Sequence, residues 1–189
     1  MQQNMKTFPM SVDAYLEAEK ESGVKHEYVN GYIHAMVGSS RRHNLLAVTI
    51  SRLLGNHLQG TGCDVFVSDM KVKAGGKTEN VFFYPDVMVS CNRHQQSRYI
   101  EEEPRLIVEV LSPSTEHFDR LAKLEAYTQI PTLEEYLLVD QRDMKIDLYR
   151  RSGEQWLLTR HGESDVIELS SINYSVAVTS IYQDVIGLI

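Results

Sequence analysis

The sequence predicts an α/β fold (mixed α+β), in which helices flank a central mixed sheet. Three observations indicate this class. The chain alternates a helix, a hairpin, a second helix, several strands and a third helix; one near-continuous apolar run has strand length; and further strand-like segments fill the C-terminal part. Helices packed on the faces of one mixed sheet bury all of these segments. We expect a single domain over residues 1–189, a length within the usual range for one domain.

The N-terminal part predicts a helix, a hairpin and a second helix. Ser11 can cap a helix that runs through Glu21. The next runs, HEYV and YIHAMV, flank an Asn-Gly pair, which predicts a hairpin because both turn positions require positive φ. The segment Gly38-Ser39-Ser40 then offers a cap to a helix that ends before Gly60, and its apolar positions recur at helical spacing. These positions are Leu46, Ile50, Leu53, Leu54 and Leu58.

The middle of the chain predicts strands. The runs CDVFVSDMKVKA and ENVFFYPDVMVSC flank Gly75-Gly76, which predicts two neighbouring strands joined by a turn. Residues 92–103 are polar and predict a surface loop. The run RLIVEVLS that follows is almost continuously apolar, as expected of a central strand covered on both faces.

A third helix and a strand-rich tail complete the prediction. The segment SPST after the central strand stops that strand and caps a helix that Pro131 ends, with an apolar side that includes Phe118, Leu121 and Tyr127. Three strands follow, EEYLLVD, KIDLYRR and QWLLTRH, with Gly153 between the last two. The final stretch alternates as a strand and is expected to finish in a short helix after Thr179.

Composition and charge exclude several classes. With 42% hydrophobic and 24% charged residues among 189, the chain is typical of a globular protein. A net charge of −7 argues against a basic nucleic-acid coat. Cys63 and Cys91 form no CxxC pair and suit a reducing cytosol as small apolar residues. Because we find neither a membrane span nor an apolar leader, we expect a cytoplasmic protein without a membrane partner.

Two acids in the strand region are candidates for chemistry. Asp86 follows Pro85 between apolar residues, so it either caps a bend or faces a site. Glu109 lies inside the most hydrophobic strand, where an ionised carboxylate needs a partner or a metal. The simpler interpretation of Glu109 is a strand-end or partly exposed side chain paired with Lys or Arg.

Acids on two neighbouring strands can share a hard divalent cation. Mg²⁺ takes one or two carboxylates together with water and substrate phosphate. Lys123, in the helix after the Glu109 strand, would stabilise the charge that develops on a phosphodiester. The alternative for Lys123 is an i,i+4 salt bridge with Asp119.

The run PDVMVSC, followed by LIVEVLSPSTEHFDRLAKLEAYTQIPTLEEYLLVD, resembles the Uma family of restriction endonuclease-like proteins, placed in the PD-(D/E)XK nuclease superfamily. The likeness extends from HEYVNGYIHAM through the C-terminal strands. It implies a restriction-endonuclease-like core and a divalent-metal site for Mg²⁺ or Mn²⁺. Its most specific part is EVLSPST with the D, K and Y that follow.

The resemblance assigns roles residue by residue. Asp86 matches the aspartate of the PD half-motif, and Glu109 matches the acid of the second half-motif. Leu111 stands where the motif lysine is expected, and Lys123 matches the position to which the family is thought to have moved that lysine. Glu27 matches an acidic position of the N-terminal motif and would add a metal ligand; the alternative is a solvated glutamate beside Lys25.

One further position matches the family. His43 lies where the family often has a histidine, near the start of the second helix after Arg41-Arg42. A helix N-terminus with two arginines can attract a phosphate. The alternative is a surface cluster in the first turn of the helix.

The leading hypothesis is therefore a metal-dependent DNA endonuclease in which Asp86 and Glu109 hold the cation and Lys123 aids catalysis. We expect a homodimer, because enzymes that cut both strands often pair two copies. The alternative is a nuclease-like binding or regulatory module without chemistry. A closed, salt-bridged arrangement of these side chains would favour the module, and carboxylates within reach of one cation would favour the enzyme.

Overall fold

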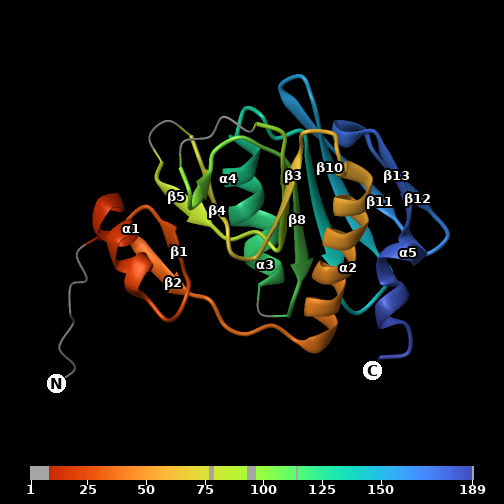
Figure 1. Ribbon diagram of the computed structural model, residues 1–189, viewed down its shortest axis with the longest axis horizontal. Helices are drawn as coiled ribbons and strands as arrows, with labels where there is room; N and C mark the ends of the chain where they lie inside the picture. Colours follow the sequence, from red (N-terminus) through yellow and green to blue (C-terminus); the bar gives the residue numbers. More distant parts are fainter. Residues whose placement is uncertain (1–8, 77–78, 93–96, 114, 189) are drawn as a thin grey trace.

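The computed structural model describes residues 9–76, 79–92, 97–113 and 115–188. It confirms a mixed fold in which helices cover the faces of mixed sheets (Figure 1). One end of the molecule carries α1, β1 and β2, and the other end carries α2 with the C-terminal elements α5, β12 and β13.

The larger sheet has six strands in the order β11-β10-β9-β8-β6-β3. Its strands are β3 (Asp64–Val67), β6 (Val87–Ser90), β8 (Pro104–Leu111), β9 (Glu135–Asp140), β10 (Ile146–Ser152) and β11 (Gln155–His161). β8 pairs with β9 in parallel and with β6 antiparallel. Its last six residues are buried, as predicted for a central strand covered on both faces.

The second sheet has five strands in the order β2-β1-β5-β4-β7. Its strands are β1 (His26–Val29), β2 (Tyr32–Ala35), β4 (Lys71–Ala74), β5 (Val81–Phe83) and β7 (Ile100–Glu101). The predicted Asn-Gly hairpin joins β1 to β2, with φ of 48° at Asn30 and 100° at Gly31. β7 lies inside the stretch predicted as a surface loop, and Glu101 within it is buried; residues 93–96 of that stretch lie outside the described residues.

The helices cover both faces of the six-stranded sheet, except that α1 packs against β1 and β5 of the five-stranded sheet. They are α1 (Val12–Glu21), α2 (Arg41–Leu58), α3 (Glu116–Phe118), the π-helical turn η1 (Asp119–Lys123), α4 (Leu124–Thr128) and α5 (Val178–Tyr182), with 3-10 turns η2 (Ser170–Ile172) and η3 (Gln183–Val185). α2 packs on one face with α5 and the two-stranded sheet of β12 (Val166–Leu169) and β13 (Tyr174–Ala177). α4 packs on the opposite face. Leu121, predicted on the apolar side, is 56% exposed, because it lies midway between the buried Asp119 and Lys123 and therefore on the opposite side of the turn.

Each of the two neighbouring strands predicted on either side of Gly75-Gly76 is in fact two strands. The first run breaks at Ser68, whose φ is 53°, and the second breaks at Tyr84-Pro85-Asp86. β3 pairs with β6 in the larger sheet, whereas β4 pairs with β5 in the smaller sheet. The two breaks lie opposite each other, because the amide of Ser68 donates to the carbonyls of Pro85 and Asp86. The hairpin passes from one sheet into the other at these breaks, and Asp86 therefore lies at the junction of the two sheets.

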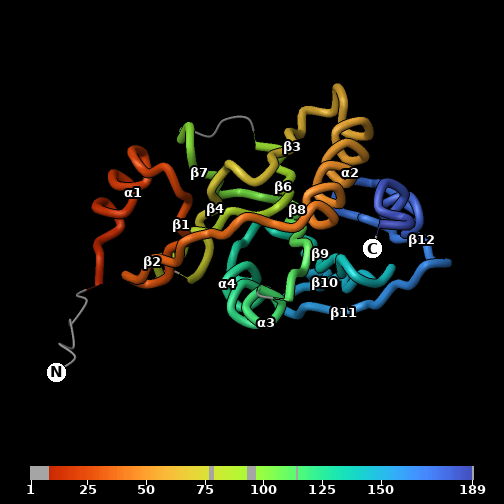
Figure 2. Tube along the Cα trace, turned by 90° about the horizontal axis from the view of Figure 1, so that it is seen from below, coloured from red at the N-terminus to blue at the C-terminus, as the bar shows by residue number. Residues whose placement is uncertain are grey.

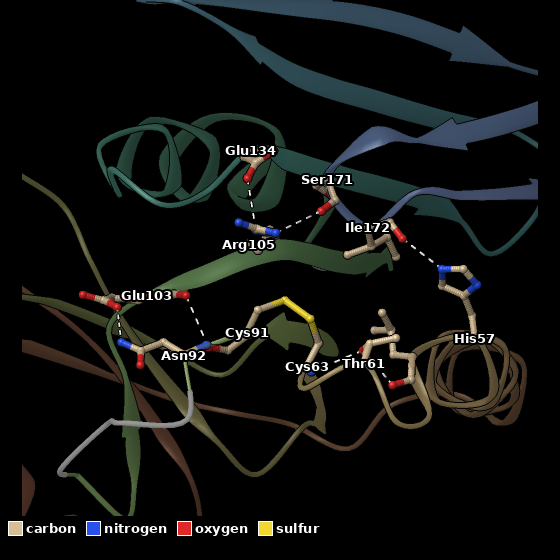
Figure 3. The surroundings of a disulfide bond; sticks show 12 residues. His57, Thr61, Cys63, Cys91, Asn92, Glu103, Arg105, Glu134, Ser171 and Ile172 are labelled. Atoms are coloured by element: carbon tan, nitrogen blue, oxygen red, sulfur yellow. Dashed lines mark hydrogen bonds and ion pairs between the residues drawn. A yellow bond between two sulfur atoms is a disulfide. The ribbon is translucent and has the colours of Figure 1, made fainter.

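The two cysteines are bonded to each other, contrary to the prediction that they are separate apolar residues. Cys63 precedes β3, and Cys91 follows β6. The antiparallel register pairs Asp64 with Ser90, so the cysteines meet across the two strands and form a disulfide (Figure 3). A sequence separation of 28 residues hides this pairing from any local pattern.

Candidate functional site

The predicted acids and lysine converge where β1, β6, β8 and the η1 turn meet. Glu27 comes from β1, Asp86 from the break before β6, Glu109 from β8 and Lys123 from the end of η1. These elements are separated in sequence; β1 belongs to the N-terminal hairpin, and β8 lies between that hairpin and α2 (Figure 1).

Glu109 is the buried carboxylate of the site. Only 3% of the residue is exposed. Its Oε1 accepts a hydrogen bond of 2.9 Å from Lys123 Nζ and one of 2.8 Å from the hydroxyl of Tyr127. The strand-end interpretation of Glu109 is therefore wrong, although the carboxylate is indeed paired with a lysine.

Lys123 is enclosed by carboxylates. Its Nζ lies 2.9 Å from Glu109 Oε1, 2.9 Å from Glu27 Oε1 and 3.4 Å from Asp119 Oδ1. The ammonium also lies 5.4 Å from the centroid of the Phe83 ring. Burial alone would lower the pKa of Lys123, but the surrounding carboxylates outweigh it and raise the pKa well above its usual value. Lys123 therefore remains an ammonium inside the protein.

Lys123 and Asp119 both face inward from the π turn η1. Both side chains are buried, and they form the i,i+4 salt bridge that the sequence predicts as the alternative role of Lys123. A π turn widens the helix by one residue per hydrogen-bonded turn, and such turns are frequent at functional sites. The salt bridge with Asp119 and the contact with Glu109 thus coexist.

Asp86 is held by a separate set of contacts. Its Oδ2 accepts the amide of Val110 at 2.7 Å, and its Oδ1 lies 3.0 Å from Nε2 of His43. The carboxylate of Asp86 is therefore bonded to β8 and to α2, on the side of the bend where Glu109 lies. The His43 side chain is 12% exposed, so the surface-cluster interpretation of His43 is wrong.

The N-terminus of α2 is anchored so that His43 reaches Asp86. The hydroxyl of Ser40 accepts the amide of His43 at 3.1 Å and donates to Oε1 of Gln141 at 2.6 Å. Nε2 of Gln141 in turn donates to the carbonyl of Leu111 at the end of β8. The same β8 strand therefore fixes both Glu109 and the helix that carries His43.

The site has an excess of negative charge. Burial raises the pKa of Glu109 well above its usual value, and repulsion from Asp119, Asp86 and Glu27 adds to the increase while Lys123 opposes it. Burial likewise raises the pKa of Asp119. Three carboxyl groups thus share one lysine, with Asp86 as a fourth acid nearby, and a further cation lowers the electrostatic energy of such an arrangement.

The donor set fits a hard divalent cation in type. Carboxylate oxygens are the ligands that Mg²⁺ prefers, and one or two of them suffice beside water and phosphate. The charge of Asp86 acts on Glu109, and Asp86 bonds the amide of the residue next to Glu109. Across the described ranges, however, no three His, Cys, Asp or Glu side chains are already arranged around one cation position. Glu27, predicted as a third ligand, is 8% exposed and pairs with Lys123, so the alternative of a solvated strand glutamate is wrong.

Two site residues were not among the predicted site residues. Asp119 and Tyr127 are the D and Y of the stretch in which the family resemblance is most specific, but the sequence assigns them only a salt bridge and an apolar contact. Their spacing from Lys123 is the available signal, because residues four apart on a helix share one face. Leu111, at the expected lysine position, is 2% exposed in the core, so no basic group approaches Glu109 from its own strand there.

Comparisons with known proteins show which family this chain belongs to. A family model described as "Uma2: Putative restriction endonuclease" matches residues 12–179. Uncharacterized protein slr1290 of Synechocystis sp. is 42% identical over 179 residues, which cover 93% of each chain. Uncharacterized protein sll1609 of the same organism is 39% identical over 161 residues, covering 82% of this chain and 90% of that protein.

A solved structure shares the fold. It is described as a crystal structure of "a putative nuclease belonging to DUF820" from Anabaena variabilis. The TM-score is 0.71 at 14% identity, and the likeness covers 93% of this chain and 98% of the other.

Within the part of this chain that the structure describes, no helix has both the length and the apolar character needed to cross a membrane.

Proposed function

This chain belongs to the Uma2 family, whose description is "Putative restriction endonuclease". On that premise we propose that the protein is a divalent-metal-dependent endonuclease that acts on DNA. Asp86 and Glu109 hold Mg²⁺ or Mn²⁺, and Lys123 stabilises charge on the scissile phosphate. The observation that carries the proposal is the convergence of these three side chains from the break before β6, from β8 and from η1.

A bound divalent cation neutralises phosphodiester charge and lowers the pKa of water at the site. The chain's own residues prepare the ligands for it. Tyr127 orients Glu109 by donating to Oε1, while the Val110 amide and His43 fix the two oxygens of Asp86. Hydrogen bonds of this kind hold ligating carboxylates in place.

Lys123 has the charge and the reach for a catalytic role. An ammonium has three donors, and in this structure it lies beside Glu109, Glu27 and Asp119. When a phosphate enters, Lys123 exchanges one of these contacts for a phosphate oxygen. The ammonium then stabilises the negative charge that develops on that oxygen. Glu27 and Asp119 then keep the lysine in place rather than binding the metal.

A negatively charged protein must overcome repulsion from DNA. The net charge of −7 opposes the approach of a polyanion, so binding depends on the cation and on local basic groups. Arg41 is exposed at the start of α2, two residues before His43. We extend the proposal to a homodimer, which presents two such sites to the two strands of a duplex.

One observation favours the alternative, a nuclease-like binding or regulatory module. The ammonium of Lys123 already pairs with three carboxylates, so a cationic group of the protein itself occupies the centre of this closed ion cluster. In that case the cluster is a structural element of the junction between the sheets. The two proposals differ in whether a metal ion supports chemistry at Asp86 and Glu109.

Nicking of supercoiled plasmid distinguishes them. Purified wild type is compared with Asp86→Asn and Glu109→Gln, variants that preserve side-chain size, and with Glu163→Gln as a matched control on an exposed loop. We expect nicking that requires Mg²⁺ or Mn²⁺, that both site variants reduce by at least about 100-fold, and that the control retains. Equal nicking by wild type and the two site variants contradicts the assignment. No nicking of plasmid by any of them favours the module, unless single-stranded RNA is cut instead, in which case only the substrate is wrong.

A further inference from the structure

The outer edge of β11 is a long strand edge on the surface. β11 is the last strand of the six-stranded sheet and runs along the outer margin of the molecule (Figure 2). Across the described residues, β10 is the only strand that pairs with it. Leu157 and Leu158 are 53% and 40% exposed, and the strand contains no proline. Natural proteins usually shorten, bulge or charge such an edge, because it can pair with another chain.

The hairpin geometry defines which backbone groups of β11 face outward. β10 and β11 are joined by a two-residue turn, so Ser152 and Gln155 form a hydrogen-bonded pair and the pairs then alternate along the ladder. The amide of Arg151 confirms this alternation, because it donates to the carbonyl of Glu134 on the other side of β10. It follows that Trp156, Leu158 and Arg160, whose partners are the odd-numbered residues of β10, direct their N–H and C=O groups away from the protein.

These three residues are spaced symmetrically about Leu158. An antiparallel two-fold pairing centred there places Leu158 opposite Leu158 of a second copy, and Trp156 opposite the other copy's Arg160. All three outward-facing residues then form hydrogen-bonded pairs with one another, which joins two six-stranded sheets into one.

The side chains are complementary in the same register. Each Trp156 ring lies beside an arginine of the other copy, a pairing that cation–π attraction favours. Leu157 faces Thr159 on the opposite side of the sheet, and Glu154 lies diagonal to the other copy's Arg160 on the same face. Like charges do not stand directly opposite one another within this register, which runs from Gln155 to His161.

We propose that β11 is the homodimer interface of this protein, with two copies paired antiparallel about Leu158. A second copy fits better than an unrelated peptide because the same seven residues supply both halves of each pair. This arrangement rests on the edge of β11 alone and does not depend on the proposed nuclease activity.

Size-exclusion chromatography with light scattering over a range of concentrations tests the interface. We expect wild type to approach a mass of about 43 kDa, twice the 21.6 kDa of one chain. Leu158→Lys places two like charges at the two-fold axis and shifts the protein to the one-chain mass. Val48→Lys changes a valine on α2 that is 47% exposed and leaves the mass unchanged. A one-chain mass for wild type at every concentration, or a two-chain mass for folded Leu158→Lys, overturns the proposal.

Cysteine cross-linking tests the register. In the proposed pairing only position 158 faces itself, with Cα atoms about 5.5 Å apart, a distance that a disulfide spans. Position 157 faces Thr159, so two cysteines at 157 lie beyond the reach of about 7 Å. Leu158→Cys therefore gives a cross-linked dimer on a non-reducing gel and Leu157→Cys does not. Equal cross-linking of both variants contradicts the register.

Discussion

Replacing Lys123 by methionine removes the one ammonium from a buried group of carboxylates. Lys123→Met keeps much of the side-chain length but leaves Glu109, Glu27 and Asp119 without the cation that lies 2.9–3.4 Å from their oxygens. All four residues are buried in the folded protein. The change therefore tests whether the ion cluster holds the junction of the two sheets together.

The expected loss of stability is large. Removing one partner of a buried ion pair costs about 3–5 kcal/mol in the free energy of unfolding, because the remaining charge has no compensation. Three carboxylates share this lysine, so we expect the upper part of that range. Such a loss is a large fraction of the roughly 5–15 kcal/mol by which proteins of this kind are stable.

The loss also depends on pH, with a defined sign. Lys123 lowers the pKa values of Glu109 and Asp119, although burial keeps both raised overall. Without the lysine both pKa values rise further above those of the unfolded chain. A carboxyl group with a raised pKa binds more protons in the folded state than in the unfolded state, so stability falls as the pH rises through that interval. We expect Lys123→Met to be destabilised more at about pH 8 than at about pH 5.

Urea denaturation followed by circular dichroism at these two pH values measures the loss. Lys73→Met, which removes a half-exposed lysine paired with Glu102, serves as the matched control and is expected to stay close to wild type. A loss below about 1 kcal/mol, the value of a surface salt bridge, or a loss that is the same at both pH values, would refute the reasoning.

Three further predictions concern other parts of the chain. Affinity for Mn²⁺, measured by calorimetry, rises with pH because burial raises the pKa of Glu109 and protons compete with the metal; affinity that falls with pH contradicts this. Cys63→Ser opens a cross-link between residues 28 apart and lowers the free energy of unfolding by about 3–4 kcal/mol in urea titration, whereas an unchanged midpoint shows that the disulfide does not constrain the unfolded chain. Glu135→Ala removes the fully buried acceptor of the Arg150 guanidinium and the Ser171 hydroxyl, and lowers the free energy of unfolding by about 3–5 kcal/mol. Faster cleavage by a protease measures this loss, and resistance equal to that of wild type contradicts it.

Local signals predicted much of the fold. The Asn-Gly pair specified the β1–β2 hairpin because its two positive φ angles suit those residues. Ser40 predicted the start of α2 because its hydroxyl accepts an amide of the first turn. The apolar run around Glu109 predicted a strand covered on both faces, which is β8. In each case the information lies within a few residues of the feature.

Features that depend on distant pairing were not predictable in the same way. The division of residues 64–90 between two sheets depends on a positive φ at Ser68 that forms opposite the Pro85 bend. The disulfide depends on the register of β3 and β6, and the pairing of Glu27 with Lys123 depends on how β1 packs beside η1. These features are set by contacts between segments, so a pattern read along one segment does not contain them.

Calorimetric titration of the purified protein with Mn²⁺ tests the central claim most directly, since the claim is that Asp86 and Glu109 hold one divalent cation. The account predicts that wild type binds the ion, that Asp86→Asn and Glu109→Gln each weaken binding by at least about 10-fold, and that the exposed matched controls Asp13→Asn and Glu163→Gln bind as wild type does. Equal binding by wild type and the two site variants would contradict it.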